Sequence, residues 1–156
     1  MPYFQKNRIF HIYNRGNHKA KICIDRQDYN QIIFLIKKYF PTQSFDLLGY
    51  CIMPNHFHIL VVKVKNQNIS YSMQIIGSSY TRYFNKKYHL IGHLFQGTYK
   101  YKAIVTERQL LATSEYIQDN PKGLSIRKYS WVYTNQRLIK SYIIIMYQMN
   151  STPIVY

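Results

Sequence analysis

The sequence has 156 residues, 47% of them hydrophobic, which is enough for one domain with a buried core. It carries 21 Lys and Arg against 6 Asp and Glu, a formal charge of +15, which favours a polyanion as the partner. No apolar run could span a bilayer and the N-terminus lacks the apolar stretch of a secretory signal, so we expect a cytoplasmic protein without a membrane partner.

Aromatic residues narrow the class of polyanion. They make up 17% of the chain and include 17 tyrosines. Basic surface interleaved with flat rings suits unpaired bases, which can stack on the rings. Single-stranded or looped nucleic acid is therefore the expected partner. A ribosome-associated protein, or a basic protein that binds RNA without chemistry, would have the same composition.

The chain begins with a strand pattern followed by a helix pattern. Residues 8–16 alternate well enough to predict a first strand, which Gly16 and Asn17 end. Asp28 is the expected cap of a helix whose apolar residues fall at helical spacing as far as Tyr39. Pro41 closes this helix.

Two further strand patterns follow with only a short connection. Residues 45–53 predict a second strand, and Pro54-Asn55 turns the chain into a third, residues 56–64. Adjacent strands with a short connection form a hairpin. We therefore expect the third strand to lie in the centre of the sheet.

A second helix is predicted from Asn68, a plausible cap. One face of it would carry Ile69, Met73, Ile76, Tyr80 and Phe84. Residues 98–105 then predict a fourth strand, with Lys100 and Lys102 on one face.

A third helix is predicted after Thr106, which can cap it, and Asn120-Pro121 ends it. Its expected inward stripe is Leu110, Leu111, Ser114 and Ile117. This order of elements favours an α+β fold, a ferredoxin-like or RRM-like sandwich with a mainly antiparallel sheet and helices on one face. The other face would be free for a ligand or for the last helix.

The signals weaken beyond residue 123. Residues 129–133 suit a short strand or irregular packing, and residues 141–149 suit either helix or strand. The run Ile143-Ile144-Ile145 favours a strand. We therefore divide the chain into one domain, residues 1–134, and a C-terminal tail of uncertain structure, residues 135–156.

Two histidines share one side of the third predicted strand. Side chains alternate along a strand, so His56 and His58 point one way while Phe57 and Ile59 point the other. Neutral imidazole is a common metal ligand, and two imidazoles on one rigid strand make half of a metal site. The plainer interpretation is a pair of half-buried polar residues on a sheet face.

Tyr116 and Asn120 lie four residues apart near the end of the third predicted helix, hence on one face and outside the leucine stripe. The phenol of Tyr116 could attack a phosphodiester, and a metal held by His56, His58 and the Asn120 oxygen could polarise the phosphate. Phosphoryl transfer requires mainly positioning and charge neutralisation, so these groups would suffice. Spacing alone also permits a surface tyrosine and an asparagine that caps the helix end.

Four separated stretches resemble, in the same order, the motifs of the single-tyrosine HUH transposases, including the domesticated kind associated with repetitive extragenic palindromes. The likeness covers most of residues 8–134. The stretches are His11-Ile12-Tyr13-Asn14-Arg15-Gly16, Gly49-Tyr50-Cys51-Ile52-Met53-Pro54-Asn55-His56-Phe57-His58-Ile59-Leu60, Gly92-His93-Leu94-Phe95-Gln96-Gly97 and Tyr116-Ile117-Gln118-Asp119-Asn120-Pro121.

The resemblance implies a metal-dependent DNA strand transferase with the HUH endonuclease fold. It implies that His56 and His58 are metal ligands, that Tyr116 is the nucleophile, and that Asn120 occupies the place of a third, amide-type ligand. The implied ion is Mg²⁺ or Mn²⁺. The implied reaction cleaves single-stranded DNA beside a hairpin and leaves a 5′-phosphotyrosyl link with a free 3′-hydroxyl, which can reverse the step.

Other polar residues have weaker assignments. Glu115 and Asp119 flank the tyrosine and would either repel DNA or supply a further metal oxygen. Gln96, in a family-like motif, would contact a base or brace its loop. The histidines outside the pair, His11, His18, His89 and His93, are expected to be structural or at the surface. The candidate DNA contacts are Arg15, Arg82, Lys86, Lys87, Gln96, Lys100 and Lys102.

Two other functions stay open. A non-catalytic RNA- or DNA-hairpin-binding module of RRM-like fold would need neither Tyr116 nor a metal. A metal phosphodiesterase that activates water would leave no covalent link. Residues after 135 match no pattern of the family, so both a monomer and a homodimer are compatible, and Tyr116 could complete its own site or that of a partner.

Overall fold

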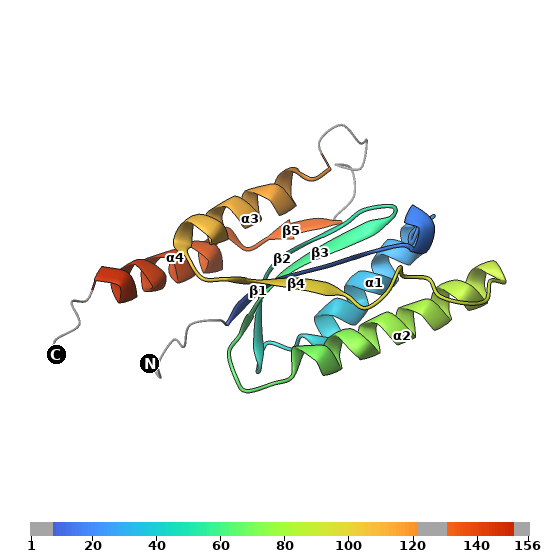
Figure 1. Ribbon diagram of the computed structural model, residues 1–156, viewed down its shortest axis with the longest axis horizontal. Coiled ribbons are helices and arrows are strands. Elements are labelled where there is room, and N and C mark those ends of the chain that lie inside the picture. Colours follow the sequence, from blue (N-terminus) through green and yellow to red (C-terminus); the bar gives the residue numbers. More distant parts are fainter. Residues whose placement is uncertain (1–7, 122–130, 152–156) are drawn as a thin grey trace.

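A computed structural model describes residues 8–121 and 131–151, which form one antiparallel sheet with helices on both faces (Figure 1). The five strands lie in the order β4-β1-β3-β2-β5, so β3 is central, as its hairpin pattern predicted. They are β1 (Ile9–Arg15), β2 (Phe45–Ile52), β3 (His56–Lys63), β4 (Lys100–Ile104) and β5 (Val132–Thr134).

The helices form two layers, one on each side of the sheet. The first pair, α1 (Arg26–Tyr39) and α2 (Ile69–Tyr88), covers one face, and the second pair, α3 (Glu107–Asp119) and α4 (Gln136–Ser151), covers the other (Figure 1). A short 3₁₀ turn, η1 (Asn17–Lys19), follows β1. The predicted α+β class with an antiparallel sheet is confirmed. The other face, predicted to be free for a ligand or for the last helix, is covered in part by α4 and also by α3, which was expected on the first face.

The alternation of β3 creates two separate cores. Phe57, Ile59 and Val61 face α1 and α2, while Leu60 and Val62 face α3 and α4. Both sets are buried because the central strand has a neighbour on each edge and helices on each side. The histidines share the face of Leu60 and Val62, at the beginning of the strand.

The start of α1 differs from the prediction. Asp25, not Asp28, is the N-cap, and its side chain accepts hydrogen bonds from the backbone N–H groups of Gln27 and Asp28. Asp28 is the third helical residue and completes a capping box by bonding back to the N–H of Asp25. The first turn of α1 is polar, so the apolar spacing begins later than the helix does.

Two further differences concern α3 and the end of the chain. Leu111 is 48% exposed and does not belong to the inward stripe, because Leu110 already occupies the buried position of that turn.

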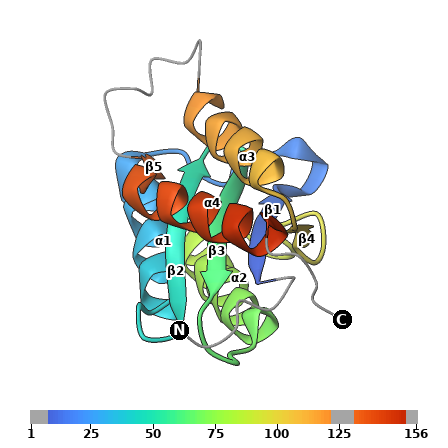
Figure 2. The same ribbon diagram turned by 90° about the vertical axis from the view of Figure 1, so that its left-hand side faces the viewer.

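Residues 136–151 form a helix despite the β-branched run at 143–145, and Figure 2 shows this helix crossing the strands. Ile139 and Met146 are buried in the second core, at helical spacing. Of the predicted short strand at 129–133, residues 129–130 lie outside the described part, and the strand is present as β5, Val132–Thr134.

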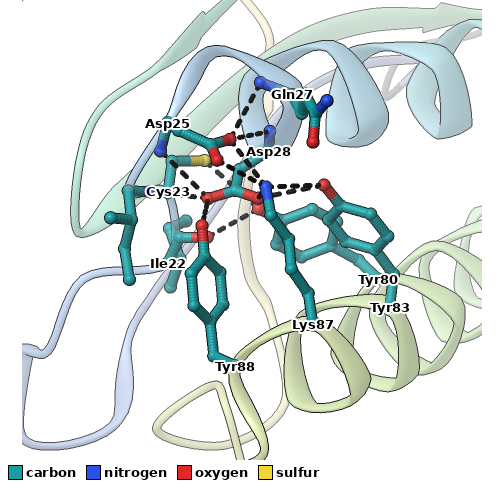
Figure 3. A network of polar contacts seen from close by, with 10 residues as sticks. Ile22, Cys23, Asp25, Gln27, Asp28, Tyr80, Tyr83, Lys87 and Tyr88 are labelled. Carbon is teal, nitrogen blue, oxygen red and sulfur yellow. Dashed lines mark hydrogen bonds and ion pairs between the residues drawn. The ribbon is translucent and has the colours of Figure 1, made fainter.

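A polar cluster joins the beginning of α1 to the end of α2 (Figure 3). The fully buried carboxylate of Asp28 accepts hydrogen bonds from the hydroxyl groups of Tyr83 and Tyr88, at 3.0 and 2.7 Å. The ammonium of Lys87 lies 2.8 Å from Asp28 and 2.6 Å from Asp25. Burial alone would raise the pKa of Asp28, but hydrogen bonds from Lys87, Tyr88 and two backbone N–H groups outweigh it and lower the pKa to about 2.

No helix within residues 8–121 and 131–151 is long and apolar enough to cross a membrane.

The substitution Asp28→Asn is expected to lower the free energy of unfolding at pH 7 by about 1 to 3 kcal/mol, because it removes the charge that three side chains bind. A carboxylate whose folded pKa is about 2, against 3.8 for its ordinary value, stabilises the fold fully above about pH 4 and loses this effect toward pH 2. Urea denaturation of both proteins across this range should therefore give converging stabilities. Asp25→Asn keeps a capping oxygen and removes only the exposed partner of Lys87, so it should lower the free energy of unfolding less than Asp28→Asn does. A difference between Asp28→Asn and the wild type that stays constant down to pH 2 would contradict the assignment.

Candidate active site at the beginning of the central strand

The first residues of β3 line a cavity of about 770 Å³ on the side of the sheet that carries α3. Cations surround a centre of aromatic and imidazole rings. The charged and ring-bearing residues that line this site cavity include Arg15, Lys19, His56, His58, Lys100 and Tyr116. They come from β1, η1, β3, β4 and α3, so the fold brings together groups that are far apart in the sequence.

His58 is nearly buried, with 6% of its surface exposed. Its Nδ1 atom lies 2.9 Å from Nε2 of His11 on β1, and its Nε2 atom is buried without a hydrogen-bond partner among the described residues. Burial, together with the neighbouring His11 and His56, lowers the pKa of His58 to about 3. Burial and the charge of Lys102 lower the pKa of His11 to about 4. Both imidazoles are therefore neutral near pH 7, the form that binds metals.

The contact between His11 and His58 selects one tautomer of each ring. If Nδ1 of His58 accepted the hydrogen bond, its Nε2 would carry a buried N–H without an acceptor, which costs about 1 to 3 kcal/mol. The favourable alternative is that Nδ1–H of His58 donates to Nε2 of His11. The Nε2 atom of His58 then presents a bare lone pair inside the site.

His56 has a similar arrangement. Its Nδ1 atom lies 2.7 Å from Oδ1 of Asn55, an atom that only accepts hydrogen bonds, so Nδ1 is the protonated nitrogen. Burial lowers the pKa of His56, which keeps the ring neutral. Its Nε2 lone pair consequently faces Oδ1 of Asn120 at 3.3 Å. Two electron-rich atoms this far apart have the spacing of neighbouring ligands of one ion, which at bond lengths of about 2.1 Å and right angles lie about 3 Å apart.

Tyr116 lies beside the histidines of its own chain. Its ring centroid is 5.2 Å from that of His58 and 6.3 Å from that of His11, in edge-on contacts. The next residue, Ile117, is buried in the second core and fixes the rotation of α3, while Tyr116 is 52% exposed. The phenol is thus supported on one side by imidazoles and open to solvent on the other. Glu115 and Asp119 line a smaller hollow beside it.

The donor set fits a divalent ion with mixed nitrogen and oxygen ligands. Within residues 8–121 and 131–151 no three His, Cys, Asp or Glu side chains are grouped as a metal site, so a third protein ligand must be of another type. The amide oxygen of Asn120 is placed for this role next to His56. The bare Nε2 of His58 is the strongest sign of fit, because a buried lone pair without a partner would be satisfied by a metal.

The candidate DNA contacts separate into two groups. Arg15, Gln96 and Lys100 line the site cavity, and Lys102 lines an adjoining hollow with His11 and Tyr116. The other three lie on α2, on the opposite side of the sheet. Of these, Lys87 binds Asp25 and Asp28, whereas Arg82 and Lys86 remain predicted contacts.

Gln96 braces its loop, which was one of its two expected roles. Its backbone N–H donates to the carbonyl of Arg15 at 3.0 Å, and its side-chain oxygen accepts a hydrogen bond from Nε of Arg15. The guanidinium of Arg15 is thereby held at the rim of the site cavity. Contact between Gln96 and a base remains a prediction.

Three residues of the site were missed by sequence reasoning. His11 was expected to be structural or at the surface, yet it bonds directly to His58, because the antiparallel register sets Tyr13 opposite His58 and His11 diagonal to it. The sequence pattern predicts only a turn at Asn55, and no pattern marks Lys19 as a site residue. Lys19 reaches the site cavity from a turn in which it and His18 have positive φ angles of 60° and 52°. Alternation along the first strand predicts which face of the sheet His11 lies on. Placing it beside His58 also requires the register between β1 and β3.

The comparisons with known proteins agree with this architecture. The family model described as "Transposase IS200 like" matches residues 4–120. A solved REP-associated tyrosine transposase bound to a REP hairpin has a TM-score of 0.59 and 16% identity, with 84% of this chain and 73% of that chain covered. A protein of Deinococcus radiodurans R1 assigned as a transposase has a TM-score of 0.52 and 13% identity, with 76% and 94% covered. No curated protein matches the sequence significantly.

The tautomer of His58 can be observed directly by NMR. In long-range ¹H–¹⁵N spectra of protein labelled at histidine, we expect His58 to carry its proton on Nδ1. His11→Phe removes the acceptor and should release His58 toward the Nε2–H tautomer, whereas His11→Gln supplies an acceptor oxygen and should preserve the Nδ1–H form. A wild-type His58 protonated on Nε2 would contradict the deduction.

Proposed function

The chain belongs to the IS200-like transposase family, and from this we propose that it cleaves and rejoins single-stranded DNA beside a hairpin through a covalent bond to Tyr116. The observation that carries the proposal is the edge-on contact of the Tyr116 ring with His58, inside a cavity lined by cations. A nucleophile, a pair of neutral imidazoles and positive charge meet in one place. These are the groups that phosphoryl transfer requires.

In the proposed reaction the hydroxyl oxygen of Tyr116 attacks the phosphorus of a phosphodiester. The bond from phosphorus to the 3′-oxygen breaks, the phenol loses its proton, and the departing oxygen gains one. The products are a 5′-phosphotyrosyl link and a free 3′-hydroxyl. Attack of a 3′-hydroxyl on this link rejoins DNA and returns the phenol, so the number of phosphodiester bonds is conserved without an external energy source.

We further propose that His56, His58 and Asn120 hold Mg²⁺ or Mn²⁺. Such an ion supplies Lewis-acid polarisation of the phosphate and neutralisation of its charge. The chain's own residues prepare the position, since Asn55 and His11 hold the two imidazoles in the tautomers that direct Nε2 inward. Arg15, kept in place by Gln96, adds a guanidinium suited to a phosphate oxygen.

A hairpin in the substrate is inferred from the similar protein that was solved bound to a REP hairpin. In this chain the support is electrostatic: Arg15, Lys19 and Lys100 line the site cavity, and the whole chain has a formal charge of +15. Each phosphate neutralised by such a cation releases counterions, so the affinity should fall with salt. Binding then rests on many contacts, while cleavage rests on few.

Tyr116→Phe is expected to abolish covalent adduct formation, because it removes the attacking oxygen and leaves the ring. The measurement incubates the protein with Mn²⁺ or Mg²⁺ and a pool of labelled hairpin oligonucleotides with random single-stranded flanks, then separates adducts on a denaturing gel. Tyr147→Phe, at an exposed tyrosine of α4, is the control. Adduct formed equally by Tyr116→Phe would overturn the assignment.

The same gel distinguishes the other two functions. Cleavage by the wild-type protein without an adduct would favour a phosphodiesterase that activates water. Binding without any cleavage would favour a hairpin-binding module.

His56→Ala is expected to reduce cleavage by roughly 100-fold or more, because it removes one metal ligand, while changing hairpin affinity less than about threefold. Cleavage rates and fluorescence anisotropy on one oligonucleotide measure the two effects, and Mn²⁺ affinity followed by electron paramagnetic resonance should fall in parallel. His89→Asn, at the end of α2, is the control. An equal loss of hairpin affinity and cleavage would show that His56 serves the fold and not the metal.

A further inference from the structure

A second hollow of about 940 Å³ lies between α2 and residues 93–99, on the side of the sheet opposite to α3. We call it the α2 groove. It meets the site cavity at one end, since Asn14 and Gln96 to Thr98 line both. A strand bound across the site cavity could therefore continue into the groove without leaving the protein surface.

The α2 groove carries no formal charge although the protein is strongly basic. None of its lining residues is Lys, Arg, Asp or Glu. Its accessible apolar surface includes the half-buried rings of Phe95 and Tyr99, with Phe57 and Met73 buried beneath, and the carboxamides of Asn17 and Gln74 also line it. Neither carboxamide forms a hydrogen bond within the described part of the chain. The groove thus offers an apolar bed with free neutral donors and acceptors at its edge.

The walls of the groove are held open by hydrogen bonds. The hydroxyl groups of Ser70 and Tyr99 lie 2.9 Å apart and join α2 to the segment that precedes β4. The other end of the same segment is fixed by the N–H of Asn17, which donates to the carbonyl of Leu94 at 2.8 Å, and by Nδ2 of Asn85, which donates to the carbonyl of Gly92 at 3.0 Å. A groove shaped in advance loses little conformational freedom when it binds.

We propose that the α2 groove binds unpaired nucleobases of the substrate strand, next to the phosphate held in the site cavity. This inference rests on the proposed function and names the part of the substrate that the groove reads. Phosphates do not suit a groove without cations, whereas base rings can stack on the half-buried rings of Phe95 and Tyr99 and present their polar edges to Asn17 and Gln74. The sugar-phosphate backbone faces outward, and the groove confers a preference for particular bases.

Gly77 allows the groove to be filled without disturbing the fold. It lies on the groove face of α2, and a Cβ atom added there would have no other atom within 4 Å. Both Gly77→Ala and Gly77→Leu replace a poor helix former by a good one and should raise the melting temperature alike. Only Gly77→Leu projects into the space proposed for the bases.

The probes are labelled DNA hairpins that carry single-stranded flanks of dA, dC, dG or dT, or abasic flanks with the same phosphates. Fluorescence anisotropy should show Gly77→Leu weakening binding of base-bearing flanks roughly tenfold and leaving abasic flanks unchanged. Gly77→Ala should match the wild type on all probes. Equal affinities of Gly77→Leu and wild type for base-bearing flanks, or an equal loss on abasic flanks, would overturn the proposal.

Gln74→Ala provides an independent test should Gly77→Leu fail to fold. It is expected to reduce the difference in affinity among the four base-bearing flanks without changing the salt dependence, since it removes an edge contact and no phosphate contact. Unchanged differences among the flanks would count against the groove. Adduct formation by Tyr116 is measured separately, so loss of base binding in a protein that forms no adduct would uphold the groove and reject the proposed chemistry.

Discussion

The central position of β3 is the constraint on which the site depends. The strand is hydrogen-bonded to β1 and β2 and lies between two helical layers, so its backbone has little freedom to move. Along most of its length both faces are filled by apolar side chains. At its beginning the face toward α3 carries imidazoles instead, and burial removes the water that would favour their protonation. One strand thereby supplies rigid spacing and the neutral state together.

The sequence alone indicates the two histidines of the candidate site, His56 and His58, but not His11, which holds His58 in place. Alternation is local, so His56, His58 and the shared face of Tyr116 and Asn120 could be read from spacing alone. The role of His11 depends on the register between β1 and β3, which joins residues 47 positions apart and has no local signal.

The same limit applies to charge and to the end of the chain. Lys87 looks like a free cation on a helix surface, but the tertiary fold sets it against Asp25 and Asp28 at the beginning of α1. The helix α4 overrides the strand preference of its isoleucine run, because burial of Ile139 and Met146 at helical spacing outweighs local propensity. Fold class was therefore predictable, while helix placement on the second face was not.

Tyr116 meets the histidines of its own chain, and the packing of α3 explains why. Ile117 and Leu110 anchor the helix in the second core, so the adjacent Tyr116 is carried toward the beginning of β3. One chain thus brings together the proposed nucleophile, the imidazoles and the carboxamide. The geometry of the candidate site is thus set by how α3 packs on the sheet, because that packing fixes where Tyr116 and Asn120 lie relative to the two histidines.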